Sequence, residues 1–132
     1  MQNEISINRI LEDLQIDHLT EMQQASISAI ERRGDVVLVA PTGSGKTLAF
    51  LLPLVRKLQP DVKTVQALIL APSRELALQI EQVFKSMGTD YKVNCCYGGH
   101  PISIEKKNLS QPPAVLIGTP GRIADHIDRG SF

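Results

Sequence analysis

Apolar residues follow two different spacings along the chain. Short runs of aliphatic residues, each ending at Gly, Pro, Ser or Thr, predict buried strands at 36–40, 67–71, 93–97 and 115–118. Apolar residues three or four positions apart predict helices at 5–14, after Thr20, and at 46–58, 74–87, 102–108 and 122–128. Repeated strand–loop–helix units predict an α/β fold with an open, mostly parallel sheet flanked by helices.

Composition narrows the class of protein. Hydrophobic residues make up 42% of the 132 residues but aromatic residues only 4%, so an aliphatic core is expected, as in a parallel sheet covered by helices. The formal net charge is zero, which excludes a globally basic nucleic-acid binder. Residues 1–35 carry seven acidic and three basic side chains, whereas residues 36–132 carry seven acidic and eleven basic ones. A polyanion site is therefore expected in the later part of the chain.

Cysteine usage and hydropathy indicate the compartment. The two cysteines, Cys95 and Cys96, are too few for a disulfide framework, so we expect a reducing, cytoplasmic location. No signal peptide and no apolar run long enough to cross a bilayer occurs in the sequence, so neither secretion nor membrane insertion is predicted. Because no Cys–His spacing matches a zinc site, the cysteines are predicted to be buried thiols, and the dispersed histidines receive no catalytic role.

The segment between the first predicted strand and the next helix has the chemistry of a phosphate-binding loop. It consists of Ala40, Pro41, Thr42, Gly43, Ser44, Gly45, Lys46 and Thr47. Glycines let the backbone curl so that its N–H groups point at oxyanions, and Lys46 supplies a charge for the β- and γ-phosphates. Thr47 offers a hydroxyl to Mg²⁺. The usual pattern begins with Gly where this chain has Ala40; the alternative is a Gly-rich turn with an incidental Lys.

Polar segments also follow the other three predicted strands. They are Pro72, Ser73 and Arg74; Gly98 and Gly99; and Thr119, Pro120, Gly121 and Arg122. In order and spacing, these segments and the phosphate loop resemble the first RecA-like domain of the DEAD-box RNA helicases, over nearly the whole chain. The resemblance implies that they bind an RNA backbone without reading its sequence, which suits arginines, hydroxyls and closely approached glycines. The alternative is that Ser73 and Thr119 simply cap helices.

Residues 16–23 resemble the glutamine motif of the same family. The resemblance implies that ATP is the nucleotide, that Gln23 reads its adenine edge and that Thr20 supports the phosphate loop. Thr20 and Gln23 also form a capping-box pattern at a helix start, and both roles can hold at once. The chain departs from the motif where Ile16 replaces an aromatic residue and where Leu19 and Glu21 replace prolines.

The resemblance implies that residues 1–132 are a fragment of an N-terminal RecA-like ATP-binding domain, with residues 1–34 as its helical glutamine-motif segment. No Asp-Glu-Ala-Asp box occurs in the sequence, so we expect an incomplete P-loop NTPase domain whose parent carries the box and a second RecA-like domain. The parent is expected to be an ATP-dependent RNA helicase in which Lys46 and Thr47 serve ATP hydrolysis.

We expect the isolated chain to bind nucleotide weakly, not to unwind RNA, and to self-associate through an uncovered sheet edge. Two alternatives remain open from the sequence. One is a complete, non-catalytic nucleotide-binding module, and the other is a DNA helicase of a neighbouring superfamily 2 group.

Overall fold

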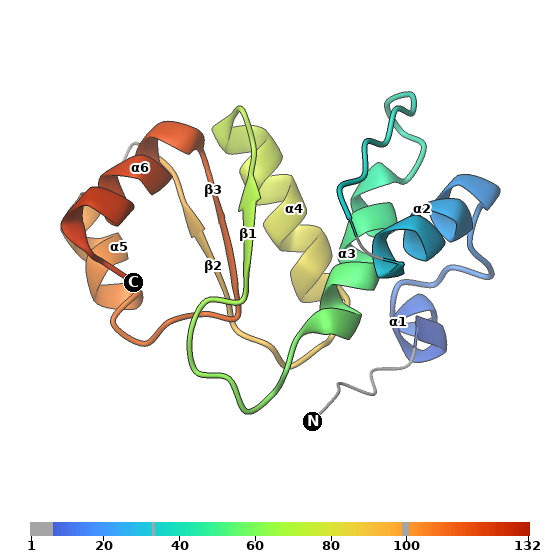
Figure 1. The fold of residues 1–132 in the computed structure, drawn as a ribbon, viewed down its shortest axis with the longest axis horizontal. Coiled ribbons are helices and arrows are strands. Elements are labelled where there is room, and N and C mark those ends of the chain that lie inside the picture. The colour runs from blue at the N-terminus through green and yellow to red at the C-terminus, as the bar shows by residue number, and fades with distance from the viewer. Residues whose placement is uncertain (1–6, 33, 99–100) are drawn as a thin grey trace.

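The computed structural model describes residues 7–32, 34–98 and 101–132. Helices and strands alternate along most of this part of the chain (Figure 1). The elements are α1 (Ile7–Asp13), α2 (Glu21–Glu31), α3 (Lys46–Lys57), β1 (Ala67–Leu70), α4 (Arg74–Ser86), β2 (Val93–Cys96), α5 (Ile102–Asn108), β3 (Val115–Gly118) and α6 (Pro120–Arg129). No helix in the described ranges is long and apolar enough to span a membrane.

The three strands form one parallel sheet in the order β1-β3-β2. Gly118 at the end of β3 pairs with Leu70 of β1 and with Cys96 of β2, so all three strands end at the same level. Figure 1 shows α5 and α6 on one side of this sheet and α1, α2 and α3 on the other, beyond α4. The predicted α/β class and the parallel sheet are therefore confirmed, and the segments that follow the strands leave from one edge.

The prediction of a strand at residues 36–40 is wrong. These residues form no regular secondary structure, and the side chains of Val37 and Val39 are 89% and 90% exposed. A strand needs a neighbour that pairs with its backbone, and none of the described strands pairs with this segment. The same lack of a partner leaves β1 at the edge of the sheet, with Leu68 and Leu70 exposed.

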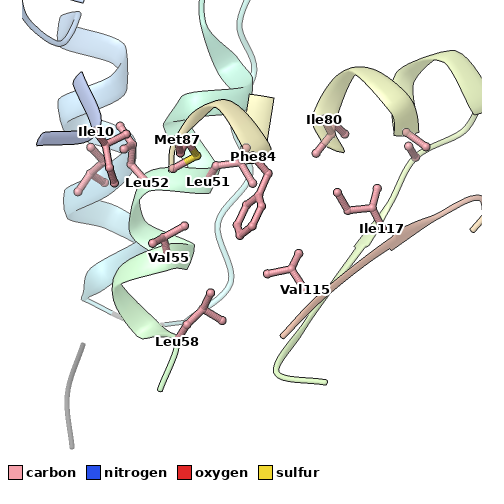
Figure 2. Packing of buried hydrophobic residues seen from close by; sticks show 13 residues of the cluster. Ile10, Leu51, Leu52, Val55, Leu58, Ile80, Phe84, Met87, Val115 and Ile117 are labelled. Carbon is pink, nitrogen blue, oxygen red and sulfur yellow. The ribbon is translucent and has the colours of Figure 1, made fainter. Parts of the chain in front are cut away.

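The alternation of side chains along β3 divides the apolar core into two clusters. Val115 and Ile117 face α4, where Phe84 reaches toward Val115 and toward the α3 residue Val55 (Figure 2). Leu116 points to the opposite face and packs with Cys96, Leu109 and Ile123 beneath α5 and α6. The larger cluster consists of Ile10, Ile27, Leu51, Leu52, Val55, Leu58, Ala71, Ala77, Ile80, Phe84, Met87, Val115 and Ile117, an almost wholly aliphatic core as predicted.

Candidate functional site

The predicted phosphate loop folds as a tight turn that leads into α3. The Ser44 N–H and hydroxyl both donate to the Pro41 carbonyl, over 3.3 and 2.6 Å. Gly43 and Gly45 have φ angles of +81° and +86°, a left-handed conformation that residues with a Cβ adopt at a cost. The glycines are therefore needed for the path of the backbone.

Lys46 and Thr47 are the first two residues of α3, and Gly45 is its N-cap. The first amides of a helix have no acceptor within the helix, and the positive end of the helix dipole favours anions there. Lys46 and Thr47 line a cavity of about 960 Å³ together with Gly43 and Gly45. This end of the cavity has the N–H donors and the positive charge that a polyphosphate needs.

Gln23 connects the start of α2 to the phosphate loop. The Thr20 N–H donates to Gln23 Oε1 over 3.0 Å, and the Gln23 N–H donates to Thr20 Oγ1 over 3.1 Å, so the predicted capping box is present. Gln23 Nε2 donates to the Gly45 carbonyl over 3.2 Å. A primary amide can make four hydrogen bonds, so one N–H and one lone pair remain for a base edge. Adenine recognition by Gln23 stays a prediction.

The cavity continues from the phosphate loop to the unpaired edge of the sheet. Its far wall is apolar and includes Leu38, Ile69 and Leu70. Ser26 also lines the cavity, and its hydroxyl is buried without a hydrogen-bond partner among the residues that the structure describes. Sequence reasoning did not single out Ser26, because a serine inside a helix gives no signal of what its side chain faces.

The three polar segments that follow the strands lie next to one another. The Ala71 N–H donates to the Gly118 carbonyl over 3.0 Å, and the Thr119 N–H donates to the Cys96 carbonyl over 3.2 Å. A Cβ on Gly118 would lie 2.6 Å from Ile123 Cδ1, so glycine is needed where α6 approaches the sheet. Of the predicted glycine pair, Gly99 lies outside the described residues.

The two predicted hydroxyl contacts differ in their roles. Ser73 caps α4, because its Oγ accepts a hydrogen bond from the Leu76 N–H over 3.2 Å. Thr119 is the N-cap residue of α6, but among the described residues its side chain makes no capping hydrogen bond. Helix α6 begins at Pro120 and not at the predicted residue 122, so Gly121 and Arg122 belong to its first turn. A proline at the first helical position accounts for the earlier start.

The two predicted phosphate-binding arginines have different surroundings. Arg74 is exposed, and its guanidinium lies 4.9 Å from the centre of the Tyr97 ring, a cation–π contact. The Arg122 side chain is only 14% exposed, and its Nε donates to Glu105 Oε1 over 2.7 Å. Arg74 is therefore the more accessible of the two.

Glu105 is the centre of a buried polar network that sequence reasoning missed. Its Oε1 also lies 2.7 Å from His126 Nε2, and its Oε2 accepts the Tyr97 N–H over 3.1 Å. A carboxylate only accepts hydrogen bonds, so His126 Nε2 carries a proton. Burial acts to raise the pKa of Glu105, but hydrogen bonds from His126, Arg122 and the Tyr97 backbone hold this pKa below its usual value. Glu105 is therefore a charged carboxylate at neutral pH.

The spacing of residues along α5 gives a weak sequence signal that Glu105 is buried. Glu105 is three residues after Ile102 and four before Leu109, which places it on the inner face of the helix. The sequence could not show its partners, because Arg122 and His126 are 17 and 21 residues away. His126, to which no catalytic role was assigned, is fully buried in this network, and its Nδ1 lies 2.9 Å from Ser131 Oγ.

The same cluster does not have the chemistry of a metal site. Ligand atoms of Cys96, Glu105 and His126 lie within 4.8 Å of one another. However, burial, together with the charge of Glu105, raises the pKa of the Cys96 thiol to about 12, so it is a neutral thiol. The Arg122 guanidinium occupies the same Glu105 oxygen that a cation would need. A hydrogen-bonded network explains these contacts, in agreement with the predicted buried thiol.

A glycine-rich phosphate loop that opens a helix, next to a parallel sheet whose loops gather at the carboxyl ends of the strands, defines a RecA-like P-loop nucleotide-binding domain. The comparison with known families narrows this class. The sequence model described as "DEAD/DEAH box helicase" matches residues 20–132, and the chain belongs to this family. The predicted family is therefore confirmed.

Curated relatives and a solved structure agree with this assignment. The chain is 44% identical over 110 residues to ATP-dependent RNA helicase eIF4A of Aspergillus oryzae, covering 82% of this chain and 26% of that protein. It is 39% identical over 125 residues to ATP-dependent RNA helicase DeaD of Escherichia coli strain K12, covering 92% and 20%. A DEAD box protein of Methanococcus jannaschii has a TM-score of 0.87 at 32% identity, covering 98% of this chain and 37% of that one. The chain thus spans about a quarter or less of these two curated relatives.

Proposed function

We propose that this chain is the ATP-binding part of an ATP-dependent RNA helicase. The observation that carries the proposal is the arrangement of the phosphate loop on α3 beside a sheet whose three strand ends gather the segments 71–74, 97–98 and 119–122. The names of the similar helicases of Aspergillus oryzae and Escherichia coli support it.

At the nucleotide end, the backbone of residues 40–47 would surround the phosphates of ATP, with Lys46 as their counter-charge. Thr47 would offer its hydroxyl to Mg²⁺, which neutralises phosphate charge when bound. The left-handed glycines and the start of α3 fit these groups, because a glycine-rich turn that leads into a helix can present backbone N–H groups to an anion. Gln23, held by Thr20 and bonded to Gly45, would recognise adenine with the remaining capacity of its amide.

At the other end, the segments after β1, β2 and β3 would bind one RNA strand through its phosphates and sugars. Arg74 is an exposed cation of this surface, while Thr119 offers a hydroxyl that is not used as a helix cap among the described residues. Contacts of this kind do not depend on base sequence. A second RecA-like domain of a longer protein would complete the site. The 132 residues contain no Asp-Glu-Ala-Asp sequence, so by themselves they are expected to bind nucleotide without unwinding RNA.

The exposed edge of β1 supports a further part of the proposal, which is self-association of the isolated chain. Leu68 and Leu70 are exposed on a strand that has no partner on one side among the described residues. Unpaired apolar edges are templates for pairing with another strand.

We also place the protein in the cytoplasm, because both of its cysteines are free thiols.

Photo-crosslinking tests the RNA-binding surface directly. A 4-thiouridine oligonucleotide is expected to crosslink within residues 72–74, 98–99 and 119–122, and a single-stranded DNA competitor is expected to reduce the yield less than RNA does. Crosslinks confined to other surfaces would overturn the RNA site. Equal competition by DNA would favour the DNA-helicase alternative.

A further inference from the structure

One continuous series of contacts joins the three segments of the RNA-binding surface. The Arg74 guanidinium, after β1, lies over the ring of Tyr97, after β2. The Tyr97 N–H donates to one oxygen of Glu105, and Arg122 of α6 donates to the other. Glu105 therefore touches two of the three segments directly and reaches the third through Tyr97.

The position of Glu105 needs an explanation other than stability. Its side chain is only 4% exposed. Burying a carboxylate is costly even when it is paired, and well-packed apolar side chains in place of a buried ion pair often give equal or greater stability. The network does, however, fix geometry, because three donors from two separate segments converge on two oxygens of one short side chain.

We propose that Glu105 is a positioning residue for the RNA-binding surface. It holds the first turn of α6 and the backbone after β2 in a fixed relation, so that both present their polar groups to the same RNA strand. Arg122 is then mainly a link between Glu105 and α6, in keeping with its low exposure. The inference rests on the proposed function, because it assigns a role only if these segments bind RNA.

Glu105→Gln separates this role from a simple charge effect. The amide has the size of the carboxylate but only one acceptor oxygen, so its NH₂ group must face either the Tyr97 N–H or the Arg122 and His126 donors. The variant also removes a negative charge, which by electrostatics alone would strengthen RNA binding. Loss of positioning therefore predicts weaker RNA binding by the variant, whereas loss of charge alone predicts tighter RNA binding.

The experiment measures RNA affinity of the 132-residue chain by fluorescence anisotropy with a fluorescein-labelled oligouridylate, and ATP affinity by calorimetry. Glu105→Gln is expected to weaken RNA binding by about tenfold, or about 1.4 kcal/mol, and to leave ATP affinity unchanged. Glu105→Asp keeps the charge but shortens the reach, so it is also expected to weaken RNA binding. The matched control is Glu31→Gln, which breaks the exposed Glu31–Arg56 ion pair and should change neither affinity.

The outcomes separate this inference from the function on which it rests. Equal or tighter RNA binding by Glu105→Gln would overturn the positioning role. Loss of ATP binding in both Glu105 variants would show that the residue supports the whole fold and would contradict a role specific to the RNA surface. A wild-type chain that binds ATP but no RNA at low salt would overturn the RNA-binding proposal itself, and the inference with it.

Discussion

The side-chain amide of Gln23 donates a hydrogen bond to the backbone carbonyl of Gly45 over 3.2 Å. This bond joins the capping box of α2 to the residue that opens α3, 22 positions later in the chain. A residue that sequence reasoning placed in two roles, helix capping and nucleotide recognition, thus also fixes the position of the phosphate loop.

Gly45→Ala is expected to disturb the loop for two separate reasons. The φ angle of +86° costs a residue with a Cβ about 1–2 kcal/mol, and the added Cβ would lie 2.4 Å from Gln23 Nε2. Gly130→Ala is the matched control, because its φ is +63° and no atom lies within 4 Å of the added Cβ. Urea unfolding should show a larger loss of stability for Gly45→Ala, and calorimetry should show weaker ATP binding for that variant alone. Equal effects of both substitutions would refute the close-approach argument.

Gln23→Ala should lower stability by about 1 kcal/mol through loss of the capping box and should reduce the preference for ATP over GTP. The control is Gln24→Ala, the exposed neighbour of Gln23, whose side-chain amide donates to the Leu19 carbonyl over 3.4 Å. Competition titrations with ATP and GTP measure the preference. An unchanged ATP-over-GTP ratio in Gln23→Ala would mean that the glutamine has only its structural role.

The pH dependence of stability tests the Glu105 network. The folded-state pKa of Glu105 is lowered below 4.5, so its contribution is fully present above about pH 4.5 and is lost as the pH falls through the lower, folded-state value. The free energy of unfolding should therefore decrease below about pH 4.5, and Glu105→Gln should flatten this decrease. If the free energy of unfolding of Glu105→Gln decreased at acid pH as much as that of the wild type, other carboxylates would be the cause of the acid sensitivity.

At neutral pH, Glu105→Ala is expected to cost about 3–5 kcal/mol, because it removes the acceptor shared by the half-buried Arg122 and the fully buried His126. Urea unfolding of the variant measures this loss. A loss under about 1 kcal/mol, the usual range for a surface ion pair, would show that the network contributes little to stability.

The helices and the paired strands were predictable because they depend on local spacing. The predicted helix at 102–108 and strand at 115–118 match α5 and β3. The segment 36–40 has the same apolar pattern as the real strands but remains unpaired, because a strand depends on a neighbour that local spacing does not describe.

The functional site likewise has one part that local sequence predicts and one part that depends on distant residues. The phosphate loop could be predicted, since its glycines and lysine are contiguous in the sequence. The position of Glu105 could not, since its burial depends on Arg122 and His126, which only the folded chain brings to it.

Self-association through β1 should be visible by light scattering. Leu68→Lys places a charge on the unpaired edge, so it should shift a concentration-dependent oligomer toward the monomer. Ile127→Lys is the control, because it replaces an exposed apolar residue on α6 away from the sheet edge. A wild-type chain that stays monomeric at high concentration would rule out this association.

Calorimetric titration of the chain with ATP and Mg²⁺ tests the central claim most directly. Wild type and the control Lys107→Ala, an exposed lysine on α5, should bind with the same affinity. Lys46→Ala, which removes the charge at the start of α3, should show no measurable binding while its circular dichroism spectrum stays that of the folded chain. Undiminished ATP affinity in Lys46→Ala would contradict the account.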